Sequence, residues 1–149
     1  MTNSESSIAG EDDMATRMPD FAVVVVGSVL VDLPDQFPTV NLHEQEPPYR
    51  GLNFPVGLAD GAAIAACLED RPALRPTSQD LLALVLQRTN VDVIAARITG
   101  LIGGNFSAEL DLLGPRGREV IPCRASDAIN AALRHPGGAP ILVDVALLA

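Results

Sequence analysis

Residues 123–143, CRASDAINAALRHPGGAPILV, predict a short helix followed at once by a strand, and this order constrains the fold more than any other stretch. Apolar residues recur there at helical spacing, which indicates one buried helical face. They are Ile129, Ala132 and Leu133. We expect Ser126 to cap this helix, because its hydroxyl can accept a hydrogen bond from a first-turn amide. The sequence His-Pro-Gly-Gly at 135–138 should end the helix, since proline breaks the hydrogen-bond ladder and glycine accepts a left-handed turn.

The polar residues of the same helix define its opposite face. Asp127, Asn130 and Arg134 fall on that face, which we expect to point away from the core. Asp127 also places a negative charge in the first turn, where the helix dipole favours one.

The rest of the chain shows strand and helix patterns that lead to this segment. Strands are predicted at residues 21–32, 39–43, 52–56, 91–101, 105–113, 119–123 and 139–143. Helices are predicted at residues 61–68, 77–88 and 126–134. We therefore expect an α+β fold: one compact domain over residues 21–149, with a mostly antiparallel or mixed, open-barrel-like sheet and about three short helices. Residues 1–20 are polar and without periodicity, and we expect a disordered acidic leader there.

Three details of these elements follow from local patterns. The strand at 21–32 is almost continuously apolar, so we expect a central strand covered on both faces and bulged at Gly27 and Ser28. Asp60 is the expected cap of the helix at 61–68. Thr77 and Asp80 have the spacing of a capping box. The helix after Thr77 should bury an apolar face made of Leu81, Leu82, Val85 and Leu86.

Composition excludes several classes of protein. The longest apolar run is too short to span a membrane. The formal charge of -9, with arginine as the only basic residue besides histidine, argues against a broad nucleic-acid-binding face. Cys67 and Cys123 lie in apolar segments and suit free thiols of a cytoplasmic protein rather than a disulfide. The five Phe and Tyr residues are scattered along the sequence, so no aromatic platform for stacking bases is expected.

Charged residues at the predicted helix starts suggest a site. Asp60, Asp80 and Asp127 each lie at a helix start, and Arg75 and Arg124 directly precede two of these helices. If the three helix starts converge, their amides and the guanidinium groups would face a phosphate together. The alternative is that each aspartate only stabilises its own helix start.

Two other acidic patterns favour a structural interpretation. Glu109 and Asp111 alternate with apolar residues in one strand, which is typical of a charged face exposed to solvent. His43 lies beside acidic residues in a strand-to-loop segment, where a solvated surface is more common than a metal site.

Four segments carry a resemblance to a known family. The hexapeptide at 124–129, Arg-Ala-Ser-Asp-Ala-Ile, is similar to the Arg-Pro-Ser-Asp-Ala-Ile segment of the bifunctional nuclease family. Residues 56–64 resemble its Ile-Gly-x-x-Glu-Ala-x-Ala-Ile segment, and residues 75–82 its Arg-Pro-x-Thr-His-Asp-Leu-Leu segment. Residues 103–106, Gly-Gly-Asn-Phe, stand where that family commonly has Asp-Gly-Thr-Phe.

The resemblance implies a nuclease active on DNA and RNA, in a compact α+β domain that self-associates, with a homodimer favoured. Such cleavage usually employs carboxylates that hold Mg²⁺ or Mn²⁺, and no organic cofactor is expected. The metal ligands themselves stay undetermined. The expected catalytic acids are Asp60, Asp80 and Asp127, and the expected substrate-binding residues are Arg75, Gln79, Arg124 and Ser126.

Departures from the family pattern keep a second function open. Gln79 replaces a histidine and cannot exchange a proton near neutral pH, and Gly103 replaces an aspartate. The alternative is therefore a catalytically degenerate member of the same fold that acts as a binding or regulatory module.

Overall fold

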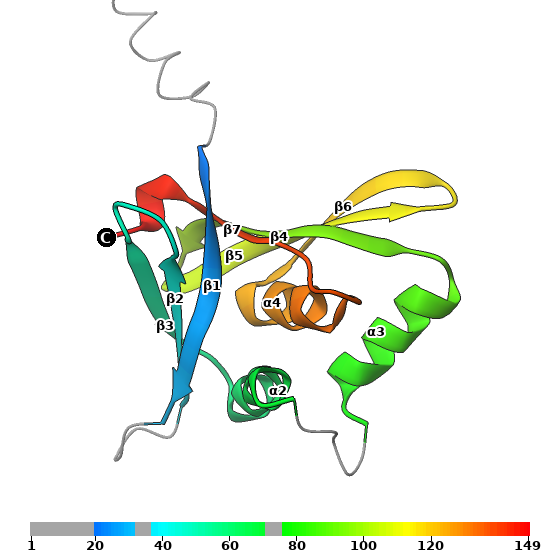
Figure 1. The fold of residues 1–149 in the computed structure, drawn as a ribbon, viewed down its shortest axis with the longest axis horizontal. Helices are drawn as coiled ribbons and strands as arrows, with labels where there is room; N and C mark the ends of the chain where they lie inside the picture. The colour runs from blue at the N-terminus through cyan, green and yellow to red at the C-terminus, as the bar shows by residue number, and fades with distance from the viewer. Residues whose placement is uncertain (1–19, 32–36, 71–75) are drawn as a thin grey trace, which may run out of the picture.

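The computed structural model describes residues 20–31, 37–70 and 76–149, which form one curved sheet with helices on one side (Figure 1). The strands are β1 (Phe21–Leu30), β2 (Thr39–Glu44), β3 (Gly51–Pro55), β4 (Asp92–Ile102), β5 (Asn105–Gly114), β6 (Gly117–Arg124) and β7 (Ile141–Asp144). The helices are α2 (Leu58–Leu68), α3 (Ser78–Arg88) and α4 (Ala125–Arg134), with a 3₁₀ turn, η1 (Val145–Leu147), after β7. The leader expected before residue 20 lies outside the described residues.

The seven strands have the order β3-β2-β1-β7-β4-β5-β6. Neighbouring strands are antiparallel except β7 and β4, which are parallel. The parallel pair arises because α4 and the following turn carry the chain from the β6 edge back to the middle of the sheet. The sheet stays open, and the α+β class with a mixed sheet is as predicted.

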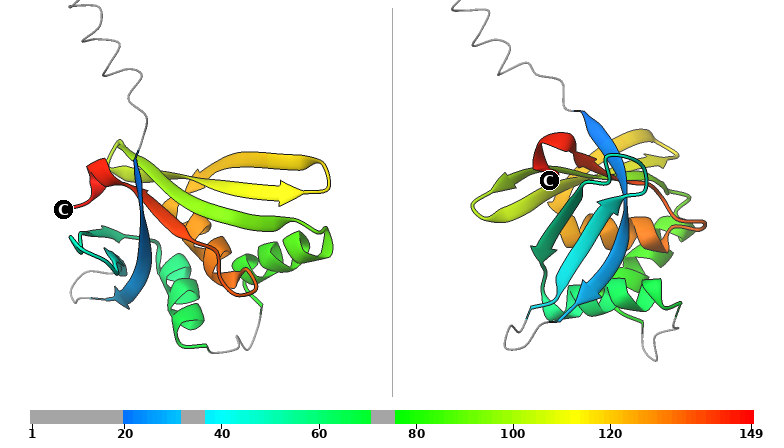
Figure 2. Two further views of the ribbon diagram at one scale, coloured as in Figure 1. Left: turned by 45° about the horizontal axis from the view of Figure 1, so that its top comes forward. Right: turned by 60° about the vertical axis from the view of Figure 1, so that its left-hand side comes forward.

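The core lies between the concave face of the sheet and α4 (Figures 1 and 2). Five aliphatic side chains from both halves of the sheet and from α4 are 0% exposed. They are Val40, Leu42, Ile98, Ile129 and Val143. The predicted amphipathic pattern of the last helix therefore places its apolar face where the sheet curves around it.

β1 differs from its prediction in one respect. It is central, between β2 and β7, and its register shifts between Val26 and Ser28 as the predicted bulge requires. The expectation that it is covered on both faces is wrong, because Val23 is 62% exposed while Val24 is 2% exposed. The helices cover only one side of the sheet, so a continuous apolar run here does not mean two buried faces.

α3 departs furthest from its expected burial. The helix forms at the predicted place, but none of its described residues, 78–88, is buried. Leu81 is 59% exposed and Val85 is 47% exposed, so the predicted buried face is wrong. Leu86 makes a partly buried contact with the core. α3 packs on α4 rather than on the sheet, which leaves most of its apolar side chains without cover (Figure 1).

Two further sequence expectations concern thiols and membranes. Cys67 and Cys123 are free, as predicted, and burial raises the pKa of the Cys123 thiol to about 11. Within the described part of the chain, no helix has the length and apolar character needed to cross a membrane.

Candidate functional site

Each helix of the described residues carries an aspartate at its third position. Asp60, Asp80 and Asp127 occupy these positions in α2, α3 and α4. A carboxylate in the first turn is favoured by the helix dipole, so these positions follow from local physics.

The caps expected at two of the three helices are wrong. α2 begins after Gly57 and α4 after Arg124, and in neither case does a described side chain cap the helix. Asp60 and Ser126 therefore lie inside the first turn instead of preceding it. Both helices start earlier than predicted because Gly57 and Arg124, with extended backbone, already turn the chain into the helix.

Asp80 is part of the capping box predicted for α3. Its carboxylate accepts hydrogen bonds from the Thr77 amide at 2.8 Å and from Arg134 Nε at 2.9 Å, and its amide donates to Thr77 Oγ1 at 3.2 Å. The Thr77 amide and the Arg134 guanidinium hold the pKa of Asp80 below its ordinary value. Asp80 thus joins α3 to α4.

Arg124 joins the other two aspartates. Its Nε and Nη2 donate to the two carboxylate oxygens of Asp127 at 2.9 and 2.8 Å, and its Nη1 donates to Asp60 Oδ2 at 3.1 Å. These bonds to Arg124 keep the pKa of Asp127 below its ordinary value. All three guanidinium nitrogens donate to these carboxylates, and the Arg124 side chain nevertheless remains 66% exposed.

The face of α4 that was expected to point away from the core is covered. Asn130 is 0% exposed and the Arg134 side chain is 9% exposed, although neither belongs to the apolar core cluster. Arg134 donates to Asn130 Oδ1 at 2.7 Å and to the Ala63 carbonyl at 3.2 Å, while Asn130 donates to the Asp60 carbonyl at 3.4 Å. α2 and α3 pack on α4, so its polar face becomes an interface between helices.

The sequence-predicted site residues come together to a large extent. Gln79 Nε2 donates to Asp127 Oδ1 at 3.3 Å, which links α3 to the Arg124 cluster. Asp60, Asp80 and Asp127 therefore belong to one continuous polar network with Arg124 and Gln79. Arg75 lies outside the described residues.

Two cavities flank this network. One of about 540 Å³ lies between α2, α3 and α4, with mostly alanine walls and with Asp80 and Arg134 among its polar groups. The other, of about 360 Å³, lies beyond Arg124. The second cavity is lined by Phe54, Pro55, Val56, Gly57, Gly104, Asn105, Phe106, Arg124, Ala125 and Ser126. Its walls are the ends of β3 and α2, the β4–β5 turn and the start of α4.

A comparison with known proteins identifies the family. The family model for the bifunctional nuclease domain matches residues 40–149, which is more than half of the chain. The chain belongs to the bifunctional nuclease domain family. No curated protein matches the chain. β1 precedes the matched range, yet it pairs with β2 and β7 and so completes the sheet of this bifunctional nuclease domain. All described residues of the Arg124 network lie inside the matched range.

The acids of this bifunctional nuclease domain do not form a ready divalent-metal site. Asp60 and Asp127 share Arg124, and Asp80 is bonded to Thr77 and Arg134. In residues 20–31, 37–70 and 76–149, no group of three or more His, Cys, Asp or Glu side chains is arranged to hold a metal. Mg²⁺ and Mn²⁺ prefer several oxygen ligands, and a guanidinium between two carboxylates does not fit that donor set. The expected Mg²⁺ or Mn²⁺ dependence stays a prediction.

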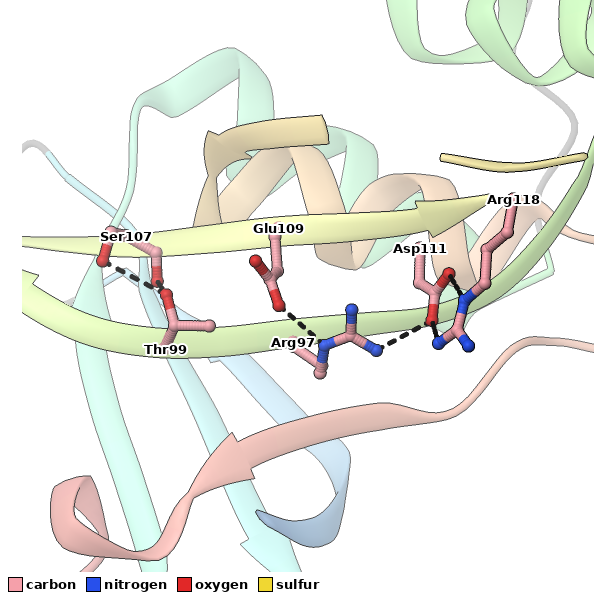
Figure 3. A network of polar contacts seen from close by, with 6 residues as sticks. All are labelled: Arg97, Thr99, Ser107, Glu109, Asp111 and Arg118. Carbon is pink, nitrogen blue, oxygen red and sulfur yellow. Dashed lines mark hydrogen bonds and ion pairs between the residues drawn. The ribbon is translucent and has the colours of Figure 1, made fainter. Parts of the chain in front are cut away.

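A second polar network lies on the opposite face of the sheet (Figure 3). Arg97 donates to Glu109 and to Asp111, both at 2.8 Å, and Arg118 donates to both carboxylate oxygens of Asp111. Glu109 and Asp111 share one face of β5, as predicted. The expectation of a solvent-exposed face is wrong for Asp111, which is 0% exposed. Two arginine side chains engage it there, and this network braces β4, β5 and β6 behind the site.

Sequence reasoning missed several of these partners. Arg97 is the lone basic residue of an otherwise mostly apolar strand, and this pattern could have indicated a partner for the acids of the neighbouring strand. Asn130 follows Ser126 and precedes Arg134 by four residues each, a spacing that places all three on one side of the helix. Phe54 and Phe106, which are far apart in the sequence, meet with ring centroids 5.2 Å apart, a contact that the sequence spacing did not indicate.

Proposed function

We propose that this bifunctional nuclease domain hydrolyses phosphodiester bonds of DNA and RNA at the Arg124 cluster. The observation that carries the proposal is the exposed guanidinium of Arg124, which Asp60 and Asp127 hold from two different helices beside a cavity. Arginine binds phosphate through two parallel hydrogen bonds, so a backbone phosphate would replace one of the two carboxylates on Arg124.

Phosphate binding should change the pKa of Asp127. A phosphate that binds Arg124 competes with the bonds that lower the pKa of Asp127, so this pKa rises toward its ordinary value. Asp127 then becomes a better proton acceptor for an attacking water. The hydrogen bond from Gln79 keeps the Asp127 carboxylate in place.

The remaining groups stabilise the transition state and hold the site together. The water oxygen attacks phosphorus, its proton passes to Asp127, and solvent protonates the departing ester oxygen. Arg124 stabilises the charge that develops on the phosphoryl oxygens. Asp60 holds Arg124 from α2, and Asp80 holds Arg134, so we assign these two acids to positioning in this scheme.

Charge limits how nucleic acid can approach. With a formal charge of -9, the chain as a whole repels a polyanion. Contact should therefore be confined to the surroundings of Arg124. We place this activity in the cytoplasm, where the free thiols of Cys67 and Cys123 are stable.

Cleavage of labelled oligonucleotides tests the proposal. Single-stranded DNA and RNA are incubated with the protein in Mg²⁺, in Mn²⁺ and in EDTA, and the products are separated on denaturing gels. We expect cleavage by the wild type and a loss of at least a hundred-fold for Asp127→Asn, in line with the 10²–10⁴-fold contribution typical of a general base.

The matched control is Asp92→Asn, which removes an exposed acid at the start of β4 and should retain full activity. Equal cleavage by Asp127→Asn and the wild type would remove Asp127 from the mechanism. The EDTA arm decides whether the expected metal requirement exists.

A binding or regulatory module remains the second candidate. The pairing of both Asp60 and Asp127 with Arg124 favours it, because these acids are engaged in the free protein. The presence of Gln79 instead of histidine favours it as well. Under this alternative the wild type binds an oligonucleotide and releases it intact in all three conditions.

A further inference from the structure

We propose that the cavity between Phe106 and Arg124 receives one unstacked nucleobase, so that the domain acts on single-stranded rather than double-stranded nucleic acid. This inference rests on the proposed function, because the phosphate next to that base would be the one bound by Arg124. We call this space the Phe106 cavity, and its lining is the ten residues given above for the 360 Å³ cavity.

The size and walls of the Phe106 cavity suit a small, partly apolar ligand. Its volume of about 360 Å³ lies at the lower end of the range for ligand pockets, roughly 300–1,000 Å³. One wall is aromatic, and another carries Arg124 and Ser126. A nucleotide combines an aromatic base with an anionic phosphate, so its two halves match these two walls.

Ser126 adds a polar residue to the lining of the Phe106 cavity. The residue is 6% exposed. Its backbone carbonyl accepts a hydrogen bond from Asn130, which fixes the first turn of α4 at the cavity wall. A hydroxyl can both donate to and accept from a group that enters the cavity.

The aromatic wall is held rigid from behind. Phe54 is 4% exposed and packs against Phe106 with an interplanar angle of 54°, so Phe106 is supported while remaining only partly buried. Asn105, next to it on the β4–β5 turn, places an amide side chain at the same cavity. Stacking on an aromatic ring accepts any base, and an amide can both donate to and accept from base edges.

Only an unpaired base can use this arrangement. In a duplex the bases are stacked and paired, and their faces cannot reach a ring inside a protein cavity. The bases of a single strand can enter the cavity without first breaking base pairs. The other cavity is a weaker candidate, because Asp80 there is already bonded to Arg134 and the walls are mostly alanine.

The test compares three fluorescein-labelled octamers in EDTA by fluorescence anisotropy. They are a deoxyadenosine single strand, the same sequence as a duplex, and an abasic sugar-phosphate chain of equal length. We expect the single strand to bind at least about ten-fold more tightly than the duplex or the abasic chain, on the scale of one stacked base.

Two variants locate the effect. Phe106→Leu keeps an apolar side chain against Phe54 and should weaken single-strand binding about ten-fold without changing the abasic chain. Ser126→Ala should weaken single-strand binding several-fold if its hydroxyl contacts the bound nucleotide, and thermal unfolding of the variant checks that its fold is intact. Tyr49→Leu, which removes an aromatic ring that is 64% exposed and outside the cavity, is the matched control.

The outcomes separate this inference from the proposed function. Equal affinity for all three octamers, or unchanged binding by both variants, would overturn the Phe106 cavity as a base site even if the protein cleaves nucleic acid. Base-dependent binding with no cleavage under any condition would support the cavity and overturn the nuclease.

Discussion

Replacing Asp111 by asparagine should destabilise the domain by about 3 kcal/mol. Asp111 is buried and is bonded by Arg97 and Arg118, so Asp111→Asn removes the negative charge and keeps the shape. Removing one partner of a buried ion pair typically costs about 3–5 kcal/mol. The lower end applies here, because Arg118 is 64% exposed and Arg97 keeps Glu109 as a partner.

Thermal and urea unfolding measure this effect. For a domain of this size, about 3 kcal/mol corresponds to a decrease in Tm of roughly 6–12 °C. Glu109→Gln is the matched control, because its side chain is 34% exposed and accepts one bond from Arg97. Glu109→Gln should lower the free energy of unfolding by less than about 1 kcal/mol. A cost for Asp111→Asn no larger than that of the control would refute the reasoning.

The same variant has a defined pH dependence. The two arginines lower the pKa of Asp111 from 3.8 to about 2, with Arg118 the larger cause. A carboxyl with a lowered pKa stabilises the folded state above its ordinary pKa, and this contribution is lost as the pH falls toward the folded value. The difference in unfolding free energy between wild type and Asp111→Asn should therefore be constant above about pH 5 and shrink between about pH 4 and pH 2.

Two further predictions concern α3. Thr77→Ala removes the capping box and should lower the unfolding free energy by about 1 kcal/mol in urea titrations, whereas Ser78→Ala should change it by less than half of that. We propose that the exposed apolar row of α3 forms a homodimer interface, so light scattering should give a dimer for the wild type. The double variant Leu81→Glu and Val85→Glu should be monomeric, with Gln87→Glu as a dimeric control; a monomeric wild type would contradict this assignment.

Patterns within one element predicted that element well. Thr77 and Asp80 interact three residues apart, so their capping box depends on no distant contact. Alternation in β5 placed Glu109 and Asp111 on one face for the same reason. The caps at Ser126 and Asp60 were predicted wrongly. Where a helix starts depends on the direction in which the chain leaves the preceding strand, and the sheet sets that direction.

Contacts between distant elements were beyond the sequence patterns. A periodic apolar face shows which side of α3 would be buried, but not whether the chain supplies a partner for Leu81 and Val85. The polar face of α4 was expected to avoid the core, and it does, but α2 and α3 cover it and bury Asn130. Phe54 and Phe106 come from separate strands, and only the curvature of the sheet brings their rings together. The three helix-start aspartates belong to one polar network, but Asp80 lines one cavity and Arg124 the other, so a single shared pocket stays a hypothesis from charge placement.

The salt dependence of oligonucleotide binding tests most directly whether Arg124 contacts phosphate. The binding constant of a single-stranded DNA octamer is measured from low to moderate salt for wild type, Arg124→Gln and Arg116→Gln, the last being an exposed arginine on the β5–β6 turn. Losing one phosphate contact reduces the magnitude of the negative slope of log K against log salt concentration by about 0.7 for single strands. We predict this decrease for Arg124→Gln and an unchanged slope for Arg116→Gln. Equal salt-dependence slopes for Arg124→Gln and the wild type would contradict a phosphate contact by Arg124.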